Sequence, residues 1–307
     1  MASPLKPIKS LKWNQKSNRS IDMAANTSKS EFENSVEAAK EFIKQGDVFQ
    51  LVLSQKLEST VTQKPFELYR SLRMVNPSPF MAFFDFGDWQ LIGSSPEVMV
   101  KAQQTEKGIQ TRLRPIAGTR PRGKNDLEDA DLEKDLLKDP KERAEHVMLV
   151  DLGRNDLGRV CTPGSVVVKE LMVIEKYSHV MHIVSEVEGT LKKENDVWDL
   201  LIASFHAGTV SGAPKIRAMQ LINQLEKQRR GPYSGVYGSI DLNGALNTAI
   251  TIRTMIVRKK NKNSFTVEVQ AGAGVVADSI PSNEYQETLN KAKGMFTALA
   301  CLDPQDL

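Results

Sequence analysis

Four strand-like stretches follow one another with only short turns between them, at residues 80–86, 89–93, 97–102 and 109–114. Stretches this close together predict a run of antiparallel pairings. Helical patterns also occur in blocks instead of alternating strictly with strands. This arrangement favours an α+β protein with layered sheets over a doubly wound nucleotide-binding fold.

Four helices are expected around these strands. The first extends from about Ser30 to Gln45, where Ser30 and Glu33 form a capping box and Gly46 suits the end. The other three are expected at Pro140 to about Leu152 with Asp139 as N-cap, at Pro214 to about Leu225, and at Ser282 to Leu299. Proline is favoured at the first helical position because its missing N–H is not needed there.

Two further patterns predict strands. Residues 49–54 alternate, with Phe49, Leu51 and Leu53 on one face, which is typical of a strand. The dipeptide Asn243-Gly244 lies between two apolar stretches. It predicts a tight hairpin, because these two residue types adopt the positive φ angles that such turns require.

Composition excludes several classes of protein. Of 307 residues, 40% are hydrophobic and 26% are charged, and no apolar run approaches the roughly 18 residues that span a bilayer. The 41 basic and 38 acidic residues are interspersed, so neither a membrane nor a nucleic acid is an expected partner. Two distant cysteines, Cys161 and Cys301, form no disulfide or zinc pattern, which fits a cytoplasmic protein. Residues 1–29 are basic without a secretory signal, and we expect a disordered tail or a truncation remnant there.

Two pairs of glutamates are each spaced three residues apart, Glu142 with Glu145 and Glu284 with Glu287. At this spacing both side chains of a pair lie on one face of a helix, and carboxylate oxygens are the ligands that Mg²⁺ prefers. Acidic residues in the first turn of a helix also offset the helix macrodipole without any metal. The residues alone leave both interpretations open.

Three glycine-containing stretches, at residues 115–119, 208–215 and 271–274, are candidates for bringing backbone N–H groups close to an anion. The second is not a Walker A loop, because Lys215 follows Ala-Pro instead of the second glycine. A carboxylate is therefore as acceptable a ligand as a phosphate. Ordinary turns remain the alternative interpretation.

Nine sequence strings carry a resemblance to a known family. They are DVFQLVLSQ, SSPE, RPIAGTRPRG, ERAEHVMLVDLGRND, YSHVMHIVS, GTVSGAPKIRAM, GPYSGVYG, AITIRT and QAGAGVVADSIPSNEYQET, in this order over about residues 30–300. With these strings the chain resembles the chorismate-utilising enzymes, and among them component I of the anthranilate synthases. The resemblance implies a chorismate-binding catalytic domain over residues 30–303, with two packed antiparallel β-sheets flanked by helices.

The activity that the resemblance implies is a lyase reaction, in which chorismate and ammonia give anthranilate and pyruvate in tryptophan biosynthesis. Mg²⁺ is the implied cofactor, with Glu145 and Glu287 similar to its direct ligands and Glu142 and Glu284 similar to residues that hold its waters. The implied nitrogen source is ammonia, or glutamine through a partner amidotransferase subunit in a hetero-oligomer. Neither cysteine of the chain lies in a nucleophile-like turn.

The implied catalytic residues are Glu97, His182 and Gln50. Glu97 resembles the general acid that protonates the departing C4 hydroxyl, a task that requires a partly desolvated carboxyl. His182 resembles the histidine that orients the ring and assists proton removal, although without the resemblance a structural histidine is the simpler interpretation. The implied substrate-binding residues are Gly118, Thr119, Thr209, Tyr233, Arg253, Gly272 and Gly274. Within this set, Arg253 and Tyr233 match the residues that grip the enolpyruvyl carboxylate, with the Gly274 N–H beside them.

Two positions distinguish the branches of the family. Gln50 stands where isochorismate and salicylate synthases have a water-activating lysine, and Ala117 stands where aminodeoxychorismate synthases have a lysine. Both favour anthranilate synthase. Members of this branch usually carry a long upstream region with a tryptophan feedback site, and here we expect that segment to be missing or truncated. Aminodeoxychorismate synthase component I and a truncated, non-catalytic chorismate-binding module are the alternatives.

Overall fold

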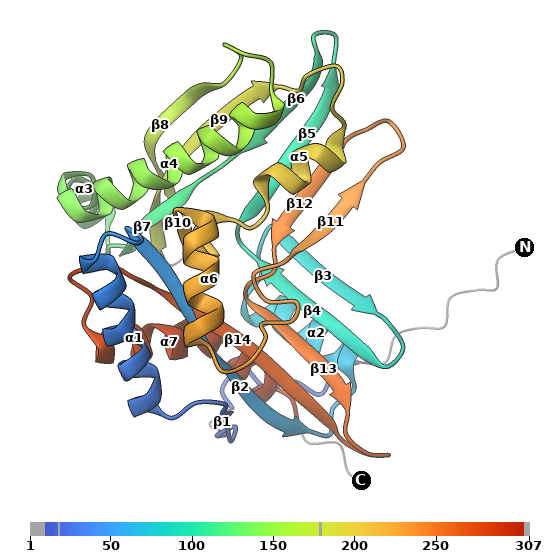
Figure 1. Cartoon of the computed structure of the whole chain (residues 1–307). Coiled ribbons are helices and arrows are strands. Elements are labelled where there is room, and N and C mark those ends of the chain that lie inside the picture. Colours follow the sequence, from blue (N-terminus) through green and yellow to red (C-terminus); the bar gives the residue numbers. More distant parts are fainter. Residues whose placement is uncertain (1–9, 18, 178–179, 304–307) are drawn as a thin grey trace, which may run out of the picture.

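The computed structural model describes residues 10–17, 19–177 and 180–303. Two antiparallel seven-stranded sheets form its framework (Figure 1). The first sheet has the order β1 (Ala24–Ala25), β2 (Gln50–Val61), β14 (Phe265–Val275), β13 (Thr254–Lys259), β4 (Trp89–Ser95) and β3 (Phe80–Asp85), with β10 (Gly212–Ala213) beside β2. The second has the order β11 (Val236–Ile240), β12 (Leu246–Ile250), β5 (Val98–Thr105), β6 (Gly108–Leu113), β9 (Val180–Thr190) and β7 (Ile116–Pro121), with β8 (Val167–Lys176) beside β9. The predicted α+β architecture with two antiparallel sheets is confirmed.

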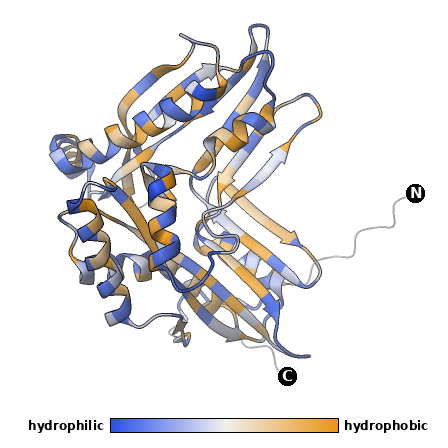
Figure 2. Ribbon diagram, in the orientation of Figure 1, coloured by the Kyte–Doolittle hydropathy of each residue, from blue (hydrophilic) through white to orange (hydrophobic). Residues whose placement is uncertain are grey.

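Helices cover both sheets. They are α1 (Lys29–Lys44), α2 (Pro65–Val75), α3 (Asp126–Lys138), α4 (Pro140–Val160), α5 (Val197–Ser204), the 3₁₀ helix η1 (Gly208–Val210), α6 (Lys215–Leu225) and α7 (Pro281–Ala300). Buried side chains of α2 and α7 share a core with the first sheet, those of α4 and α5 with the second, and those of α1 and α6 with β2. Hydrophobic residues recur along the strands and on the helix sides that meet them (Figure 2). Within the described ranges, no helix combines the length and the apolar character needed to cross a membrane.

The capping box of α1 lies two residues upstream of the predicted one. Ser28 is the N-cap: its hydroxyl accepts a hydrogen bond from the Glu31 N–H, and the Glu31 carboxylate accepts one from the Ser28 N–H at 2.9 Å. Ser28 with Glu31 and Ser30 with Glu33 have the same spacing, so the pattern alone did not separate them. The predicted Ser30 cap is wrong, because Ser30 already lies within the helix.

Helix α4 is longer than predicted. Asp139 caps its start as expected, because its carboxylate accepts hydrogen bonds from two backbone N–H groups. The helix continues through Gly153 to Val160, although glycine in a helix costs about 1 kcal/mol relative to alanine. Leu157 and Val160 are buried in the core of the second sheet, and their burial offsets this cost. The predicted end near Leu152 is therefore too early.

Strand β2 does not alternate as predicted. Phe49 is 73% exposed and precedes the strand, whereas Gln50, Leu51 and Val52 are all buried. The start of β2 is covered on both faces, because α1 and α6 pack on one of them and the candidate site lies on the other. The predicted hairpin is confirmed: β11 and β12 pair around a turn in which Gly244 has φ +81°.

Residues 10–17 and 19–29 contact the rest of the fold, where a disordered tail or a truncation remnant was expected. Trp13 forms a bridge with Leu302 and donates a hydrogen bond from Nε1 to Ser71 Oγ at 3.0 Å. The two residues of β1 pair with β2. These contacts are long-range, which is why the basic composition of this segment did not reveal them. Residues 1–9 and 18, which the prediction also covered, lie outside the described residues.

Candidate active site

The chain passes directly from a strand of one sheet to a strand of the other at two adjacent places, with no helix between, and each of these crossings carries a predicted site residue. Glu97 lies between β4 of the first sheet and β5 of the second, and Arg253 lies between β12 and β13. The crossings are hydrogen-bonded to each other, because the Ile250 N–H donates to the Glu97 carbonyl and the Ser94 N–H donates to the Arg253 carbonyl, both at 3.1 Å. Glu97 and Arg253 are therefore brought to one location between the sheets.

The Glu97 carboxyl group is surrounded by protein, although the residue keeps part of its surface accessible. Burial raises its pKa to about 7, and the nearby Thr209 hydroxyl and Lys291 charge offset only part of that effect. A carboxyl group with such a pKa is largely protonated just below neutral pH and is suited to donate a proton. The Thr209 hydroxyl is itself buried and close enough to Glu97 to lower the pKa of that carboxyl, but it makes no hydrogen bond of normal geometry in the described part of the chain.

Arg253 and Tyr233 form a site for an anion. No described side chain pairs with the half-buried Arg253 guanidinium, and burial lowers its pKa despite the nearby Tyr233 and Glu287. Burial raises the pKa of Tyr233 to about 12, so its phenol stays protonated and can donate a hydrogen bond. An unpaired buried cation is costly, and a bound carboxylate would relieve that cost through a two-pronged pair.

Two glycines of β14 leave room beside these groups. A Cβ atom on Gly272 would lie 2.7 Å from the Tyr233 hydroxyl, and one on Gly274 would lie 2.6 Å from Gln50 Nε2. Both distances are far below van der Waals contact, so any other residue would displace its neighbour. For the glycine-containing stretch at residues 271–274, the sequence left ordinary turns as the alternative. The structure places this stretch within strand β14, next to candidate site residues.

Gln50 connects the first sheet to the helix that carries one glutamate pair. Its Nε2 donates to Glu145 Oε1 at 3.0 Å. Its Oε1 is buried without a partner among the residues described. An amide has no basic nitrogen, so this side chain can orient a ligand or a carboxylate but cannot activate water as a base.

His182 is held from one side by β7. Its Nδ1 lies 3.0 Å from Thr119 Oγ1 and 3.1 Å from the Gly118 carbonyl oxygen. Because a carbonyl oxygen only accepts, we assign the proton to Nδ1, which leaves Nε2 with a free lone pair. Burial lowers the pKa of His182, the Gly118 carbonyl raises it in part, and the charge of Arg253 adds to the lowering. The neutral ring is suited to accept a proton.

The four glutamates lie near the starts of two helices, α4 and α7. Burial and then the charge of Glu145 raise the pKa of Glu142, and Arg120 at 3.5 Å offsets part of this. Burial also raises the pKa of Glu284, with a further contribution from Glu287. Each pair offers hard oxygen donors that fit Mg²⁺. No group of three or more His, Cys, Asp or Glu in the described ranges could hold a metal ion, so the four-glutamate site stays a prediction.

Lys291 is a site residue that the sequence analysis missed. Its Nζ lies 2.6 Å from Glu287 Oε1 and donates to the Gly272 carbonyl oxygen at 3.0 Å, and its charge acts on Glu97. It follows Glu287 by four residues, which places both on one face of α7. That spacing was available in the sequence, although its link to Glu97 was not.

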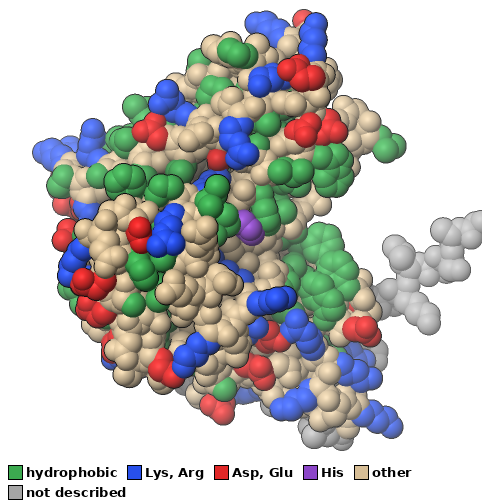
Figure 3. Space-filling view, in the orientation of Figure 1, with side chains coloured by type: hydrophobic (Ala, Val, Ile, Leu, Met, Phe, Trp, Pro, Cys, Tyr) green, Lys and Arg blue, Asp and Glu red, His purple; other side chains and the backbone are tan. Residues whose placement is uncertain are grey.

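A pocket open to solvent adjoins Glu97 and Thr209. From there it extends between α4 and the segment that follows α5, where Asp156 and Ser204 line it. Asp156 pairs with Lys215 at 2.5 Å, and burial raises its pKa to about 6 although Lys215 opposes this shift. In the space-filling view one face of the molecule is hollowed between the two sheets (Figure 3).

Several of the predicted residues lie near one another. Thr209 affects the pKa of Glu97, the charges of Glu97 and Arg253 affect the pKa of Tyr233, and a Cβ atom on Gly272 would lie 2.7 Å from the Tyr233 hydroxyl. The charge of Arg253 acts on His182, which contacts Thr119 and Gly118. A Cβ atom on Gly118 would lie 3.2 Å from Glu142 Oε2. The site therefore spans both sheets and the starts of α4 and α7.

Comparisons with known proteins agree with this arrangement. The family model of the chorismate binding enzyme matches residues 7–297. Component 1 of anthranilate synthase from Synechocystis is 61% identical over 285 residues, which cover 92% of this chain and 56% of that protein. The Aquifex aeolicus protein of the same name is 54% identical over 275 residues, covering 90% of this chain and 54% of that protein. The chain thus spans little more than half the length of these relatives.

Solved structures are similar as well. The crystal structure of anthranilate synthase component I from Streptococcus pneumoniae has a TM-score of 0.82 and 46% identity, covering 91% of this chain and 60% of that chain. The menaquinone-specific isochorismate synthase from Escherichia coli has a TM-score of 0.81 at 22% identity, covering 97% and 66%. The second likeness concerns the fold alone.

Proposed function

The chain belongs to the family of chorismate binding enzymes, and on that premise we propose that it is the catalytic region of an anthranilate synthase component 1. The proposed reaction converts chorismate and ammonia into anthranilate, pyruvate and water. The names of the relatives from Synechocystis, Aquifex aeolicus and Streptococcus pneumoniae support it. We further propose that the protein acts in tryptophan biosynthesis in the cytoplasm and forms a hetero-oligomer with a glutamine amidotransferase.

One observation carries the proposal: the adjacent, hydrogen-bonded crossings between the sheets carry Glu97, whose burial raises the pKa of its carboxyl group to about 7, and Arg253, which no described side chain neutralises. In the proposed complex, Arg253 and the Tyr233 hydroxyl bind the enolpyruvyl carboxylate, and the Gly274 N–H lies beside them. Thr209, Gly118, Thr119 and Gly272 form the remaining substrate contacts. Binding the carboxylate would supply the counter-charge that Arg253 lacks.

Two side chains carry out the proton transfers of the proposed reaction. Glu97 gives its proton to the C4 hydroxyl as that group leaves as water, while ammonia adds to the ring at C2. His182 Nε2 then accepts the proton from ring carbon C2 as the C3–O bond breaks and the ring becomes aromatic, and the departing enolpyruvate takes up a proton to give pyruvate. The directions agree with the raised pKa of the acid and the lowered pKa of the histidine, both caused by burial.

Mg²⁺ is the proposed cofactor, with Glu145 and Glu287 as direct ligands and Glu142 and Glu284 holding its waters. When bound, the ion neutralises the ring carboxylate and withdraws electron density from the ring. Gln50 orients Glu145 through its 3.0 Å hydrogen bond. In the structure Glu287 Oε1 is paired with Lys291 Nζ at 2.6 Å.

Two observations favour ammonia as the nucleophile. Gln50 is a neutral amide, so the position offers no base for water. Burial raises the pKa of both Cys161 and Cys301, so neither is a ready thiolate for releasing ammonia from glutamine. A separate amidotransferase is therefore the proposed source in the cell.

The experiment that tests the function is an assay of the purified chain with chorismate, ammonium and Mg²⁺, read by the fluorescence of anthranilate. We expect fluorescent product with ammonium alone, and product from glutamine only when an amidotransferase subunit is added. An aminodeoxychorismate product would overturn the proposed branch. Chorismate binding without any turnover would favour a non-catalytic binding module instead.

A further inference from the structure

Among the described residues, the outer edge of β2 is paired with other strands at two short stretches. β10 pairs with its first residues and β1 with its later ones. Between them, side chains bind backbone groups of β2: the Ser54 N–H donates to Glu226 Oε1 at 2.8 Å, and the Val52 carbonyl accepts from Arg230 Nη2 at 2.6 Å. Glu226 and Arg230 thus take the place of a strand at this edge.

Glu226 and Arg230 form a buried, two-pronged ion pair. Arg230 Nη2 lies 2.6 Å from Glu226 Oε1, and Arg230 Nε lies 2.9 Å from Oε2. The Arg230 side chain is only 14% exposed and the Glu226 side chain only 8%. Burial acts to lower the pKa of Arg230, but the hydrogen bonds and charge of Glu226 outweigh it and raise the pKa. The pair is therefore charged and geometrically fixed.

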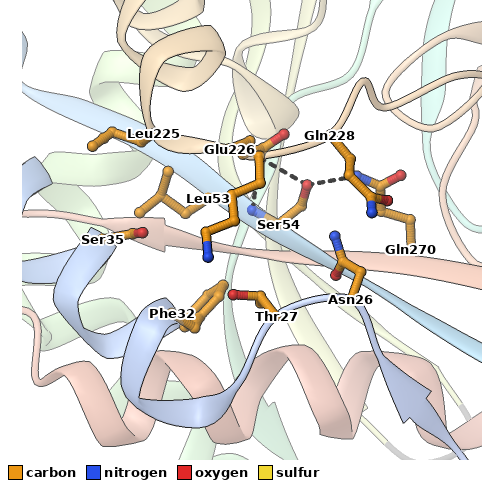
Figure 4. A pocket seen from close by; sticks show the side chains of 11 residues that line it. Asn26, Thr27, Phe32, Ser35, Leu53, Ser54, Leu225, Glu226, Gln228 and Gln270 are labelled. Atoms are coloured by element: carbon orange, nitrogen blue, oxygen red, sulfur yellow. Dashed lines mark hydrogen bonds between the residues drawn. The ribbon is translucent and has the colours of Figure 1, made fainter.

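The pair is also connected to β14. Ser54 Oγ donates to Glu226 Oε1 at 2.8 Å, and Gln270 Nε2 donates to Ser54 Oγ at 2.8 Å. Figure 4 shows Glu226, Ser54 and Gln270 in line along these hydrogen bonds. Gln270 precedes Gly272 of the proposed substrate site by two residues and lies on the same face of the strand.

Arg230 contacts two segments that face the proposed substrate. Its Nη1 donates to the Val210 carbonyl at 2.6 Å, next to Thr209. Its guanidinium carbon lies 5.4 Å from the centre of the Tyr233 ring, a distance at which a cation is attracted to the ring face. The Tyr233 hydroxyl forms no hydrogen bond with the other described residues, so only this contact and packing fix its direction.

We propose that Arg230, held by Glu226, is a positioning residue that aims Tyr233 and Thr209 at the carboxylate end of chorismate. The inference rests on the proposed function. One guanidinium fork binds β2, η1 and the Tyr233 ring at once. Lysine carries the same charge but cannot make these contacts together, because its ammonium group is a single point.

The test compares Arg230→Lys with Lys227→Ala, a control three residues away whose exposed side chain pairs with Glu31 on the surface. For each protein we would measure KM and kcat with ammonium, the Kd for chorismate by calorimetry, and the thermal midpoint. We expect Arg230→Lys to raise KM and Kd on the order of tenfold, the size of one lost charge-assisted hydrogen bond. Its kcat should fall less, and Lys227→Ala should change none of these values.

A merely structural role predicts a different result. Arg230→Lys would then lower the thermal midpoint while leaving KM and Kd at wild-type values, and that outcome would overturn the proposal. A second comparison places Arg230→Lys in a Tyr233→Phe background, where the hydroxyl to be aimed is gone. We expect Arg230→Lys to change Kd by a smaller factor in that background. If the double variant instead changes Kd by the product of the two single-variant factors, Arg230 and Tyr233 are not coupled and the proposal is contradicted.

The two proposals fail in distinguishable ways. Wild-type chain that produces anthranilate supports the proposed function whatever Arg230→Lys does. If the wild-type chain binds chorismate without converting it, the Kd values of wild type and Arg230→Lys still test the role of Arg230. Wild-type chain that neither binds nor converts chorismate would refute the proposed function and, with it, the role of Arg230.

Discussion

Two acid–arginine sets lie near Tyr233, one on the crossings between the sheets and one at the outer edge of β2, and their surroundings differ. Glu226 and Arg230 bind each other through two contacts and also hold backbone groups of β2 and η1. Glu97 and Arg253 have no ion pair in the described part of the chain, and burial raises the pKa of the acid and lowers that of the arginine. The first set is satisfied within the protein.

This difference separates an acid–arginine set that stabilises the fold from one that is available to bind a ligand. A satisfied buried pair gains little from a ligand, because its hydrogen bonds are already made. An unpaired buried charge destabilises the protein, and a bound ligand of opposite charge removes that destabilisation. Similar residue types thus serve opposite purposes, and removing them should have opposite consequences.

Glu97→Gln should have the largest effect on activity, because an amide cannot supply the proton that the departing hydroxyl requires. We expect kcat to fall roughly 10²–10⁴-fold, measured by anthranilate fluorescence. Glu106→Gln, an exposed acid on a turn, is the matched control. Wild-type activity should fall as the pH rises through about 7, the pKa of Glu97. An unchanged kcat in Glu97→Gln would remove it from the role of acid.

The free energy of unfolding should also depend on pH through the ionisation of Glu97. The pKa of Glu97 in the folded protein is raised from 4.5 to about 7, so between these values the folded state holds more protons than the unfolded state. The contribution is fully present below pH 4.5 and is lost as the pH rises through about 7. Chemical denaturation of wild type and Glu97→Gln across this window measures it, and parallel pH profiles would contradict the assignment.

Arg230→Met should have the largest effect on folding, because it leaves the Glu226 carboxylate buried without its partner. We expect the free energy of unfolding to drop by about 3–5 kcal/mol, measured by urea denaturation. Removing the exposed Lys227 charge should cost under about 1 kcal/mol. A small loss in Arg230→Met would mean that Glu226 finds water or another partner, and the two sets would then be alike.

Arg253→Met should break substrate binding without harming the fold. Losing the charged fork should raise the KM for chorismate on the order of 100-fold. The free energy of unfolding should stay equal or increase, because an unpaired buried charge is removed. Arg230→Met should lower stability, whereas Arg253→Met should not. This difference in sign is the most direct test of the contrast between the two acid–arginine sets. A clear loss of stability would show that Arg253 has a structural partner.

Glu287→Gln should have the smallest effect of these on the fold and a specific one on the metal. With one carboxylate donor lost, the Mg²⁺ concentration for half-maximal activity should rise roughly tenfold or more. Calorimetric titration with Mg²⁺ gives a readout that does not depend on turnover. Glu37→Gln on the exposed face of α1 is the control. Equal Mg²⁺ affinity in both variants would take Glu287 out of the metal site.

Local patterns predicted the elements that local chemistry specifies. The Asp139-Pro140 start, the Asn243-Gly244 hairpin and the strands β3 to β6 were found, with ends shifted by a few residues. The missed features were those set by distant packing: the end of α4, the doubly covered start of β2, and the ordered segment around Trp13. Burial against distant residues decided each of these.

The candidate site shows the same division. Strings such as SSPE and AITIRT located Glu97 and Arg253 through family resemblance, and the structure places them at adjacent crossings. Lys291 was missed although its spacing from Glu287 is local. Arg230 had no signal of its own, because it lies 178 residues from Val52 and 20 from Val210, whose carbonyls it binds.

By itself, the sequence determined the α+β class, the family and the identities of the residues available for chemistry, because these follow from patterns within short windows and from matching strings. Only the tertiary structure decided which acid has a raised pKa, which arginine lacks a partner and which one is tied in place. Protonation and pairing depend on burial and on distances between residues far apart in the chain. Those quantities exist only once the two sheets have packed.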